Sequence, residues 1–267
     1  MRFEIRLNRE TPIRLPIQYN SILQGMIYDN ISPELAHQLH DIGYPYGKRS
    51  FKLFTFSNIS GTYRLDRGKS EIVFAPPIRV LISSPIERFI YELGYSMLIN
   101  DGLRLGDNHV KLANMNVPPE PEIQSSELIG MLSPMTVYST LKTHDGRSKT
   151  YYYSPFEDEF SQLIESNLKK KYSLIYGTEP NESQTVSIEP VKVDKRSEKI
   201  LKYKGTVIKA WRGVYTIEGD PELIKVGYDA GLGSKNSQGF GCFKFIRRGD
   251  EDDRRNHTDR ANTSGRR

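Results

Sequence analysis

Residues 231–241 read Gly231-Leu232-Gly233-Ser234-Lys235-Asn236-Ser237-Gln238-Gly239-Phe240-Gly241, so that four glycines surround a short polar tract near the end of the folded part of the chain. Glycine permits a positive φ and lets a ligand approach the bare backbone. Successive backbone N–H groups in such a turn form a concavity that binds anions. Lys235 adds a positive charge, and its neighbours add hydrogen-bonding groups. The stretch therefore predicts a loop that binds phosphate.

Two common motifs that bind nucleotide phosphates do not fit this loop. The dinucleotide fingerprint needs G-x-G-x-x-G between a strand and a helix, whereas here five residues separate the two G-x-G pairs and the loop follows a predicted helix. The P-loop pattern G-x-x-x-x-G-K-[ST] does not occur in the sequence. A purely structural loop with glycines at tight bends stays open as the alternative.

Length and composition indicate a globular protein with room for two domains. The 267 residues are 37% hydrophobic and 27% charged, and the net charge of +5 favours a polyanionic partner. No run approaches the ~18 apolar residues of a membrane span, and the first residues lack the apolar core of a signal peptide. A single cysteine, Cys242, precludes an internal disulfide. We therefore expect a cytoplasmic protein without a membrane partner.

Hydrophobic periodicity predicts two similar series of elements. In the first half we expect strands at 3–7, 51–57, 71–74, 79–82 and 109–117, and helices at 18–30, from residue 32, and at 84–100. In the second half we expect strands at 128–132, 135–141, 149–153, 185–193, 206–217 and 240–246, a turn at 144–146, and helices at 154–172 and 220–230. Four of the helix starts combine a capping residue with a following proline, namely Ser32, Ser84, Ser154 and Asp220.

Each half therefore has the order β-α-β-β-α-β, which is the ferredoxin-like motif and also the topology of RNA-recognition modules. We predict an α+β protein with two tandem ferredoxin-like (RNA-recognition-motif-like) domains, 1–117 and 126–246. Residues 118–125 contain three prolines and form the predicted linker. Residues 247–267 hold seven arginines and five acidic residues with almost nothing apolar, which predicts a disordered charged tail.

Two such halves with a terminal G-x-G-x(5)-G-F-G loop resemble the CRISPR repeat-processing endoribonucleases of the repeat-associated RNA-binding superfamily. The resemblance covers about residues 1–246. Leu23-Gln24-Gly25-Met26-Ile27-Tyr28, Leu39-His40 and Lys52-Leu53-Phe54-Thr55-Phe56-Ser57 resemble the catalytic segments of one branch, in which a tyrosine, a histidine and a lysine cleave RNA without metal. Carried over by position, these residues are Tyr28, His40 and Lys52. The resemblance implies no metal and no other cofactor.

The three residue types suit RNA cleavage, because the 2′-OH beside the scissile phosphate supplies the nucleophile. Cleavage then needs a base, an acid and a cation. We expect Tyr28 to orient or deprotonate the 2′-OH, His40 to protonate the leaving 5′-oxygen, and Lys52 to stabilise the transition state. The products would be a 2′,3′-cyclic phosphate and a 5′-OH, and the acid and base assignments can be exchanged.

Each of these residues also has a plainer interpretation. His40 can be a surface residue whose charge suits a helix end, Tyr28 an aromatic at the edge of the core, and Lys52 a strand residue that faces solvent. His37 and His40 can together ligate a metal at i, i+3 spacing, but we expect two surface histidines because the pattern offers no third ligand.

The resemblance implies CRISPR repeat RNA as the partner and leaves an effector complex and a homodimer open as further partners. The predicted RNA contacts are Gly231, Gly233, Ser234, Lys235, Asn236, Ser237, Gly239 and Gly241 in the loop, and Lys48 and Arg49 before the predicted strand at 51–57. Two rival functions remain: a non-catalytic RNA-binding subunit of an effector complex, and a tandem RNA-recognition module of unrelated function. The sequence lacks the K/R-G-F/Y-G/A-F-V motif that an RNA-recognition module is expected to carry, which speaks against the second rival.

Overall fold

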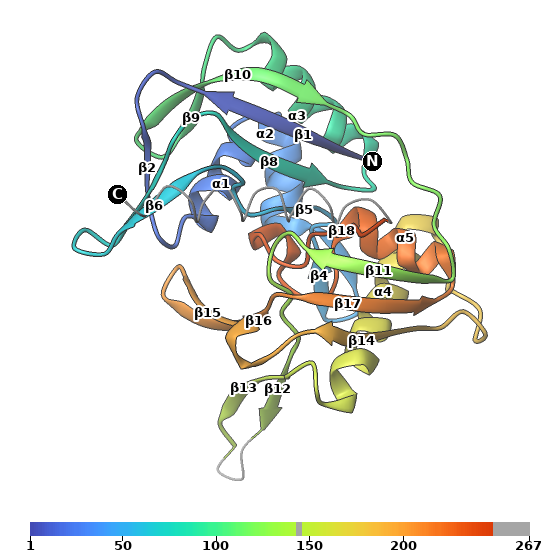
Figure 1. Ribbon diagram of the computed structural model, residues 1–267. Helices are drawn as coiled ribbons and strands as arrows, with labels where there is room; N and C mark the ends of the chain where they lie inside the picture. The colour runs from blue at the N-terminus through green and yellow to red at the C-terminus, as the bar shows by residue number, and fades with distance from the viewer. Residues whose placement is uncertain (143–145, 248–267) are drawn as a thin grey trace.

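The first half of the chain is built on one antiparallel sheet with the strand order β5-β8-β1-β10-β9 (Figure 1). The computed structural model describes residues 1–142 and 146–247. The strands of this sheet are β1 (Arg2–Asn8), β5 (Thr55–Phe56), β8 (Ile78–Ser83), β9 (Leu103–Leu105) and β10 (Asn108–Asn116). Alternation along β1 buries Phe3, Ile5 and Leu7 on one face and leaves Arg6 exposed, as the sequence predicted.

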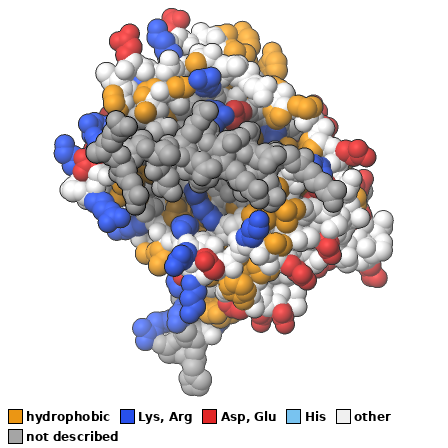
Figure 2. Space-filling view, viewed as in Figure 1, with side chains coloured by type: hydrophobic (Ala, Val, Ile, Leu, Met, Phe, Trp, Pro, Cys, Tyr) orange, Lys and Arg blue, Asp and Glu red, His pale blue; other side chains and the backbone are white. Residues whose placement is uncertain are grey.

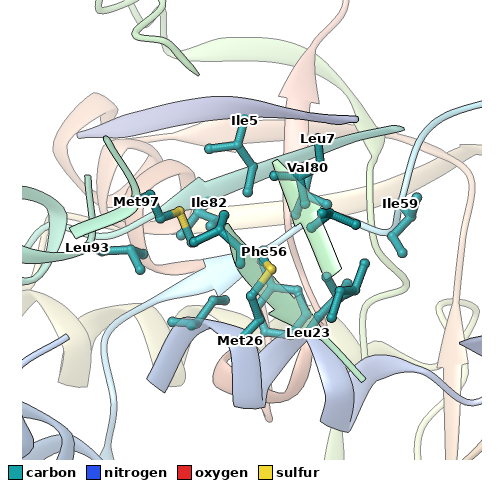
Figure 3. Packing of buried hydrophobic residues seen from close by; sticks show 14 of the residues in the cluster. Ile5, Leu7, Leu23, Met26, Phe56, Ile59, Val80, Ile82, Leu93 and Met97 are labelled. Atoms are coloured by element: carbon teal, nitrogen blue, oxygen red, sulfur yellow. The ribbon is translucent and has the colours of Figure 1, made fainter. Parts of the chain in front are cut away.

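Helices cover the apolar face of this sheet. They are α1 (Asn20–Tyr28), α2 (Pro33–His37), the π-helical turn η1 (Gln38–Ile42) and α3 (Glu87–Ile99). Figure 3 shows Ile5 and Val80 of the sheet packed toward Leu23 and Met26 of α1, with Phe56 between them. Most buried hydrophobic residues of this half form one cluster, which runs from residue 3 to residue 110.

Smaller ribbons complete the first half. One three-stranded sheet has the order β2-β7-β6, formed by β2 (Ile13–Pro16), β6 (Tyr63–Asp66) and β7 (Glu71–Phe74). A hairpin joins β3 (Tyr44–Tyr46) to β4 (Arg49–Phe51). The single strand predicted at 51–57 was wrong, because Leu53 has a φ of 52° and breaks the extended backbone between β4 and β5.

The second half repeats this arrangement on a four-stranded antiparallel sheet with the order β14-β17-β11-β18. Its strands are β11 (Ser126–Met131), β14 (Val186–Lys192), β17 (Val214–Gly219) and β18 (Phe243–Phe245), and its helices are α4 (Asp158–Tyr176) and α5 (Pro221–Ala230). In both sheets the first of the four main strands lies between the third and the fourth. The expectation of an α+β fold is confirmed.

Two hairpins project from the second half (Figure 1). One joins β12 (Tyr138–Lys142) to β13 (Ser148–Tyr152), and the other joins β15 (Glu198–Tyr203) to β16 (Thr206–Trp211). The short turns η2 (Lys195–Ser197) and η3 (Asn236–Gln238) precede β15 and β18. The sequence did not predict β15, and its long strand at 206–217 divides into β16 and β17 because Gly213 turns the chain at a φ of 133°.

The predicted helix starts divide into two groups. Ser32 and Asp220 cap α2 and α5, and each side chain accepts a hydrogen bond from a backbone N–H of the first turn. Ser84 and Ser154 instead cap the turns that lead into α3 and α4, which begin at Glu87 and Asp158. Ser84 also donates to the carbonyl of Leu53, so its hydroxyl serves the turn and a neighbouring segment.

Residues 117–125 contain neither helix nor strand and connect β10 to β11. Of the predicted tail, Arg247 is ordered by an ion pair of 2.8 Å with Glu127, and residues 248–267 lie outside the described residues, as do His144 and Asp145 of the predicted turn. Within 1–142 and 146–247, no helix combines the length and the apolar character needed to cross a membrane.

The two halves meet along the glycine-rich segment. The hydroxyl of Thr55 donates to the carbonyl of Phe240 at 3.0 Å, and the side-chain amide of Asn20 donates to the carbonyl of Gln238 at 2.8 Å. Arg2 of β1 is buried and donates to the carbonyl of Phe243 at 3.0 Å. These polar contacts between buried groups hold the two sheets in a defined relative position.

Candidate active site and groove

His40 lies in the π-helical turn η1, directly after α2. π-Helical turns are rare in proteins, and those that do occur lie often at functional sites. The imidazole is exposed, and its Nδ1 atom lies 2.7 Å from an oxygen of Asp41. Because an ionised carboxylate only accepts hydrogen bonds, this contact places the proton on Nδ1 and leaves Nε2 for other chemistry.

Asp41 is a site residue that sequence reasoning missed. One carboxylate oxygen faces His40, and the other lies 2.6 Å from Nδ1 of His37. The hydrogen bonds from His40 and His37 hold the pKa of Asp41 below its ordinary value. Both histidines are exposed, as predicted, and Asp41 joins them through its two oxygens. The signal was available, since Asp41 directly follows His40 in the sequence.

Tyr28 ends α1, and its half-buried ring lies edge-on to the imidazole of His40, with 5.6 Å between ring centroids. The same ring packs edge-on against buried Phe54 at 5.9 Å. Burial raises the pKa of Tyr28 above the ordinary value for a phenol, and the nearby hydroxyl of Tyr203 and charge of Asp41 add to this shift. The phenol therefore stays protonated at neutral pH.

Lys52 follows β4, and its Nζ atom donates a hydrogen bond of 2.7 Å to the main-chain carbonyl of His40. Partial burial lowers the pKa of Lys52, and the charge of Asp41 opposes that shift. The structure thus brings the three residues of the predicted trio, Tyr28, His40 and Lys52, to one region at the end of α1.

The trio nevertheless opens onto two cavities. We call the first the His40 pocket; its volume is about 510 Å³, and its lining includes Tyr28, His37, His40, Asp41 and Lys204. The second, which we call the interhalf groove, has a volume of about 610 Å³ and includes Lys52 in its lining. Lys52 therefore lies between the two cavities, with its ammonium bonded to the backbone of the pocket residue His40.

The interhalf groove is bordered by segments from both halves of the chain. Residues 49–54 form one wall, β12 forms another, and residues 233–238 of the glycine-rich loop form the third. The ammonium of Lys235 lies 5.1 Å from the centre of the Tyr138 ring, which is a cation–π distance. Of the two predicted contacts before the strand, Arg49 lines the groove, whereas Lys48 is exposed on the β3–β4 turn and lines neither cavity.

The glycine-rich loop differs from the predicted open phosphate cradle. Gly231, Gly239 and Gly241 are buried against protein atoms and do not line the groove. Several backbone N–H groups of the loop already donate to protein carbonyls and are not available to a ligand. For example, those of Ser234 and Gly241 bond to the carbonyls of Thr136 and Pro134. The glycines therefore serve close packing of the loop onto its neighbours.

The middle of the loop does face the groove. Gly233, Ser234, Lys235, Asn236 and Ser237 all contribute to its lining. Within the part of the chain that the structure describes, the backbone N–H groups of residues 235, 236 and 237 have no protein acceptor. These three groups, with the lysine side chain, are what the loop offers to an anion.

Lys171 is a second residue that sequence reasoning missed. It comes from α4 and is fully buried, and its ammonium donates to the carbonyl of Gly231 at 2.6 Å and to Oδ1 of Asn236 at 2.8 Å. Burial lowers the pKa of Lys171 to about 7. Asn236 in turn donates to the carbonyls of Leu232 and Phe240. Lys171 and Asn236 thus form the internal support of the loop, and a helix of mixed charge gave no signal for it.

Cys242 is fully buried in this region, and burial raises the pKa of its thiol to about 11. A buried thiol with a raised pKa is unreactive, so Cys242 serves as a small core residue. Among the described residues, no group of three or more histidine, cysteine, aspartate or glutamate side chains is arranged to hold a metal ion.

Known proteins are similar to this chain in sequence and in fold. A family model described as CRISPR associated protein Cas6, C-terminal, matches residues 118–245. CRISPR-associated endoribonuclease Cas6 of Pyrococcus furiosus is 30% identical over 251 residues, which cover 91% of this chain and 89% of the relative. CRISPR-associated endoribonuclease Cas6 1 of Methanocaldococcus jannaschii is 28% identical over 247 residues, with 90% and 91% covered. A solved structure described as CRISPR associated protein Cas6 is 26% identical and matches with a TM-score of 0.75, covering 92% of this chain and 99% of that chain.

Proposed function

Because this chain belongs to the Cas6 family of CRISPR-associated endoribonucleases, we propose that it cleaves CRISPR precursor transcripts within their repeats and so produces guide RNAs. The reaction is metal-independent and begins with attack of the 2′-OH on the neighbouring phosphate. Its products are a 2′,3′-cyclic phosphate and a 5′-OH. The observation that carries the proposal is the convergence of Tyr28, His40 and Lys52, drawn from three separate segments, at the end of α1.

The contacts of the trio support a division of roles. His40 acts as the general acid in its doubly protonated form: Asp41 accepts a hydrogen bond from Nδ1–H, and Nε2–H gives its proton to the departing 5′-oxygen, which leaves a neutral imidazole. Tyr28 aligns the 2′-OH as a neutral phenol, because its raised pKa keeps its own hydroxyl protonated. A water molecule then accepts the proton of the 2′-OH. Lys52 uses one ammonium hydrogen on the carbonyl of His40 and directs the others at the phosphate oxygens.

The interhalf groove is the proposed path of the RNA strand. Arg49, Lys52 and Lys235 line it and supply positive charge to the phosphate backbone. The free backbone N–H groups of the glycine-rich loop add phosphate contacts, and base contacts elsewhere set the sequence preference. Repeat RNA is therefore the partner that this surface suits.

We also infer that the halves are two ferredoxin-like domains, 1–117 and 126–246. The shared order of the four main strands supports this division. Two separate hydrophobic clusters support it as well, since the second draws only on residues from 123 to 245.

The test is incubation of the full-length protein with a 5′-labelled RNA that carries one CRISPR repeat from the source genome, in the presence of EDTA. We expect one cut that yields a cyclic phosphate end. His40→Ala should reduce the cleavage rate by about 100-fold or more while the dissociation constant for RNA stays within a factor of two. His109→Ala, which changes an exposed histidine of β10, is the matched control.

Two outcomes would contradict the proposal. A requirement for added metal would remove the chemistry, and rapid cleavage of an RNA with 2′-deoxyribose at the scissile position would remove the nucleophile. Tight binding without any product would instead identify a non-catalytic RNA-binding subunit.

A further inference from the structure

The hairpin formed by β15 and β16 belongs to the second half but reaches the active-site helix of the first half. The backbone N–H of Lys202 donates to the side-chain oxygen of Gln18 at 3.1 Å, and the hydroxyl of Tyr203 donates to the side-chain oxygen of Gln24 in α1. Gln24 donates in turn to the carbonyl of Ser237 in the glycine-rich loop at 2.7 Å. The tip of the hairpin is therefore held in place one helical turn from Tyr28.

This anchoring puts Lys204, at the tip, in the lining of the His40 pocket. The pocket lining also holds Tyr28, His37, His40 and Asp41, so that Lys204 is the one lysine or arginine among its described lining residues. The side chain of Lys204 is exposed, its ammonium lies 5.9 Å from the centre of the Tyr203 ring, and within residues 1–142 and 146–247 it has no carboxylate partner. A cation without an acidic partner beside a histidine–aspartate pair suits a ligand that brings its own negative charge.

The turn that carries Lys204 is one in which lysine is an unusual choice. Lys204 and Gly205 connect paired Tyr203 and Thr206, and both have positive φ, 44° and 86°. Two-residue hairpin turns of this form strongly prefer Asn-Gly or Asp-Gly, because an ordinary side chain rarely adopts the first conformation. The backbone conformation of the turn therefore does not explain the lysine at position 204.

The rest of the hairpin carries the same charge. From residue 195 to residue 209 the chain has six lysines or arginines and one glutamate. That glutamate, Glu198, pairs with Lys209 at 3.4 Å, away from the tip. Figure 2 shows lysine and arginine side chains along the left of the drawn face, and the lower part of this region is where Figure 1 places β15, β16 and the β12–β13 hairpin.

We propose that Lys204 is a second cation of the cleavage site, which binds a non-bridging oxygen of the reacting phosphodiester from the side opposite Lys52. This inference rests on the proposed function. It means that the site is complete only when the second half of the chain docks its hairpin on α1. Lys52 approaches from the interhalf groove and Lys204 from the His40 pocket, so that the phosphate charge is neutralised from both cavities.

The experiment compares Lys204→Asn, Lys204→Arg and Lys111→Asn with the wild-type protein. Asparagine accepts the left-handed conformation of the turn, so Lys204→Asn should unfold at the same or a higher urea concentration. Lys111 is an exposed lysine of β10 that lines neither cavity, and Lys111→Asn is the matched loss of charge. The single-turnover cleavage rate of the same repeat RNA is measured at saturating protein in EDTA.

We expect Lys204→Asn to reduce this rate about 10-fold or more, Lys204→Arg to stay within about three-fold, and Lys111→Asn to match the wild type. A rate for Lys204→Asn within two-fold of the wild type overturns the inference, whether or not RNA affinity changes, while the proposed function stands. If the wild-type protein itself binds but does not cut, the proposed function fails first and the inference fails with it.

Discussion

The Nζ atom of Lys52 donates a 2.7 Å hydrogen bond to the main-chain oxygen of His40, and this contact joins the segment after β4 to the π-helical turn. The lysine side chain therefore fixes the backbone of the residue that we assign as the acid. An ammonium has three hydrogens, so this structural bond leaves two for a phosphate. One residue can in this way position the catalytic turn and stabilise the transition state.

The first prediction concerns the protonation state of Tyr28. Tyr28→Phe keeps the ring contacts with His40 and Phe54 but removes the hydroxyl, and we expect a cleavage rate about 10- to 100-fold lower. Burial raises the pKa of this phenol above its ordinary 10, so the wild type should gain nothing from tyrosinate between pH 7 and 10. The ratio of the two rates should be constant over that range. A ratio that grows about ten-fold per pH unit would instead show Tyr28 acting as a base.

The second prediction concerns the buried lysine. Lys171→Met leaves the carbonyl of Gly231 and the side chain of Asn236 without their donor, so we expect the free energy of unfolding at pH 7 to fall by about 1–3 kcal/mol. Lys170→Met, on the half-buried neighbour, is the control and should change it by less than about 0.5 kcal/mol. Urea denaturation measures both.

The same lysine should make stability depend on pH. Its pKa is about 7 in the folded protein and 10.5 as the ordinary value, so between these limits the unfolded chain binds more protons. Stability from this residue therefore rises with pH from 7 to 10.5, by about 1 kcal/mol per pH unit. Lys171→Met should remove that rise, and an unchanged slope between pH 7.5 and 9.5 would contradict the lowered pKa of the buried lysine.

The third prediction tests the contact between the halves. Arg2→Gln removes a buried guanidinium that donates to the carbonyls of Phe243 and Tyr228 and stacks 3.1 Å from the centre of the Tyr228 ring. We expect a loss of about 3 kcal/mol in the free energy of unfolding. Arg6→Gln, on the exposed face of the same strand, should change it by less than about 0.5 kcal/mol. Equal losses for the two variants would mean that the buried contact adds nothing.

The fourth prediction separates backbone conformation from packing in the glycine-rich loop. Gly241 and Gly177 have similar φ values, +77° and +73°. An added Cβ meets the oxygen of Leu232 at 2.0 Å in Gly241 but nothing within 4 Å in Gly177. Gly177→Ala should cost about 1–2 kcal/mol of stability, and Gly241→Ala at least twice as much, with weaker RNA binding. Comparable urea midpoints for the two variants would argue against tight packing of the loop.

Local signals predicted much of the fold. The caps at Ser32 and Asp220 were found because a cap, a following proline and an acidic residue lie within three positions of one another. Strands such as β1 were found because alternation reports one buried face. The break at Leu53 was missed because a leucine at positive φ is rare and has no local sequence signature. The strand β15 was missed because its residues do not alternate cleanly: Lys199 shares a face with Leu201, and Ile200 on the other face is exposed.

The candidate site was predictable as residue types and less so as geometry. Tyr28, His40 and Lys52 were identified from resemblance, and their mutual contacts only from coordinates. Lys204 and Lys171 could not be found in this way, because each acts through contacts more than 60 positions away or across the two halves. The glycine-rich motif was recognised from the sequence, but the close packing of Gly231, Gly239 and Gly241 against their neighbours was visible only in the structure.

The buried bonds from Thr55, Asn20 and Gln24 to the glycine-rich segment leave little freedom for the two sheets to swing apart. The interhalf groove between the two halves therefore does not close around a bound ligand. Under the proposed function, the RNA strand must bend and unstack to fit between the fixed walls of the interhalf groove, so that the free-energy cost of fitting falls on the RNA. Repeats that are already unpaired near the cut would bind at the lowest free-energy cost. Selection among transcripts would then depend on the flexibility of the RNA as much as on its base sequence.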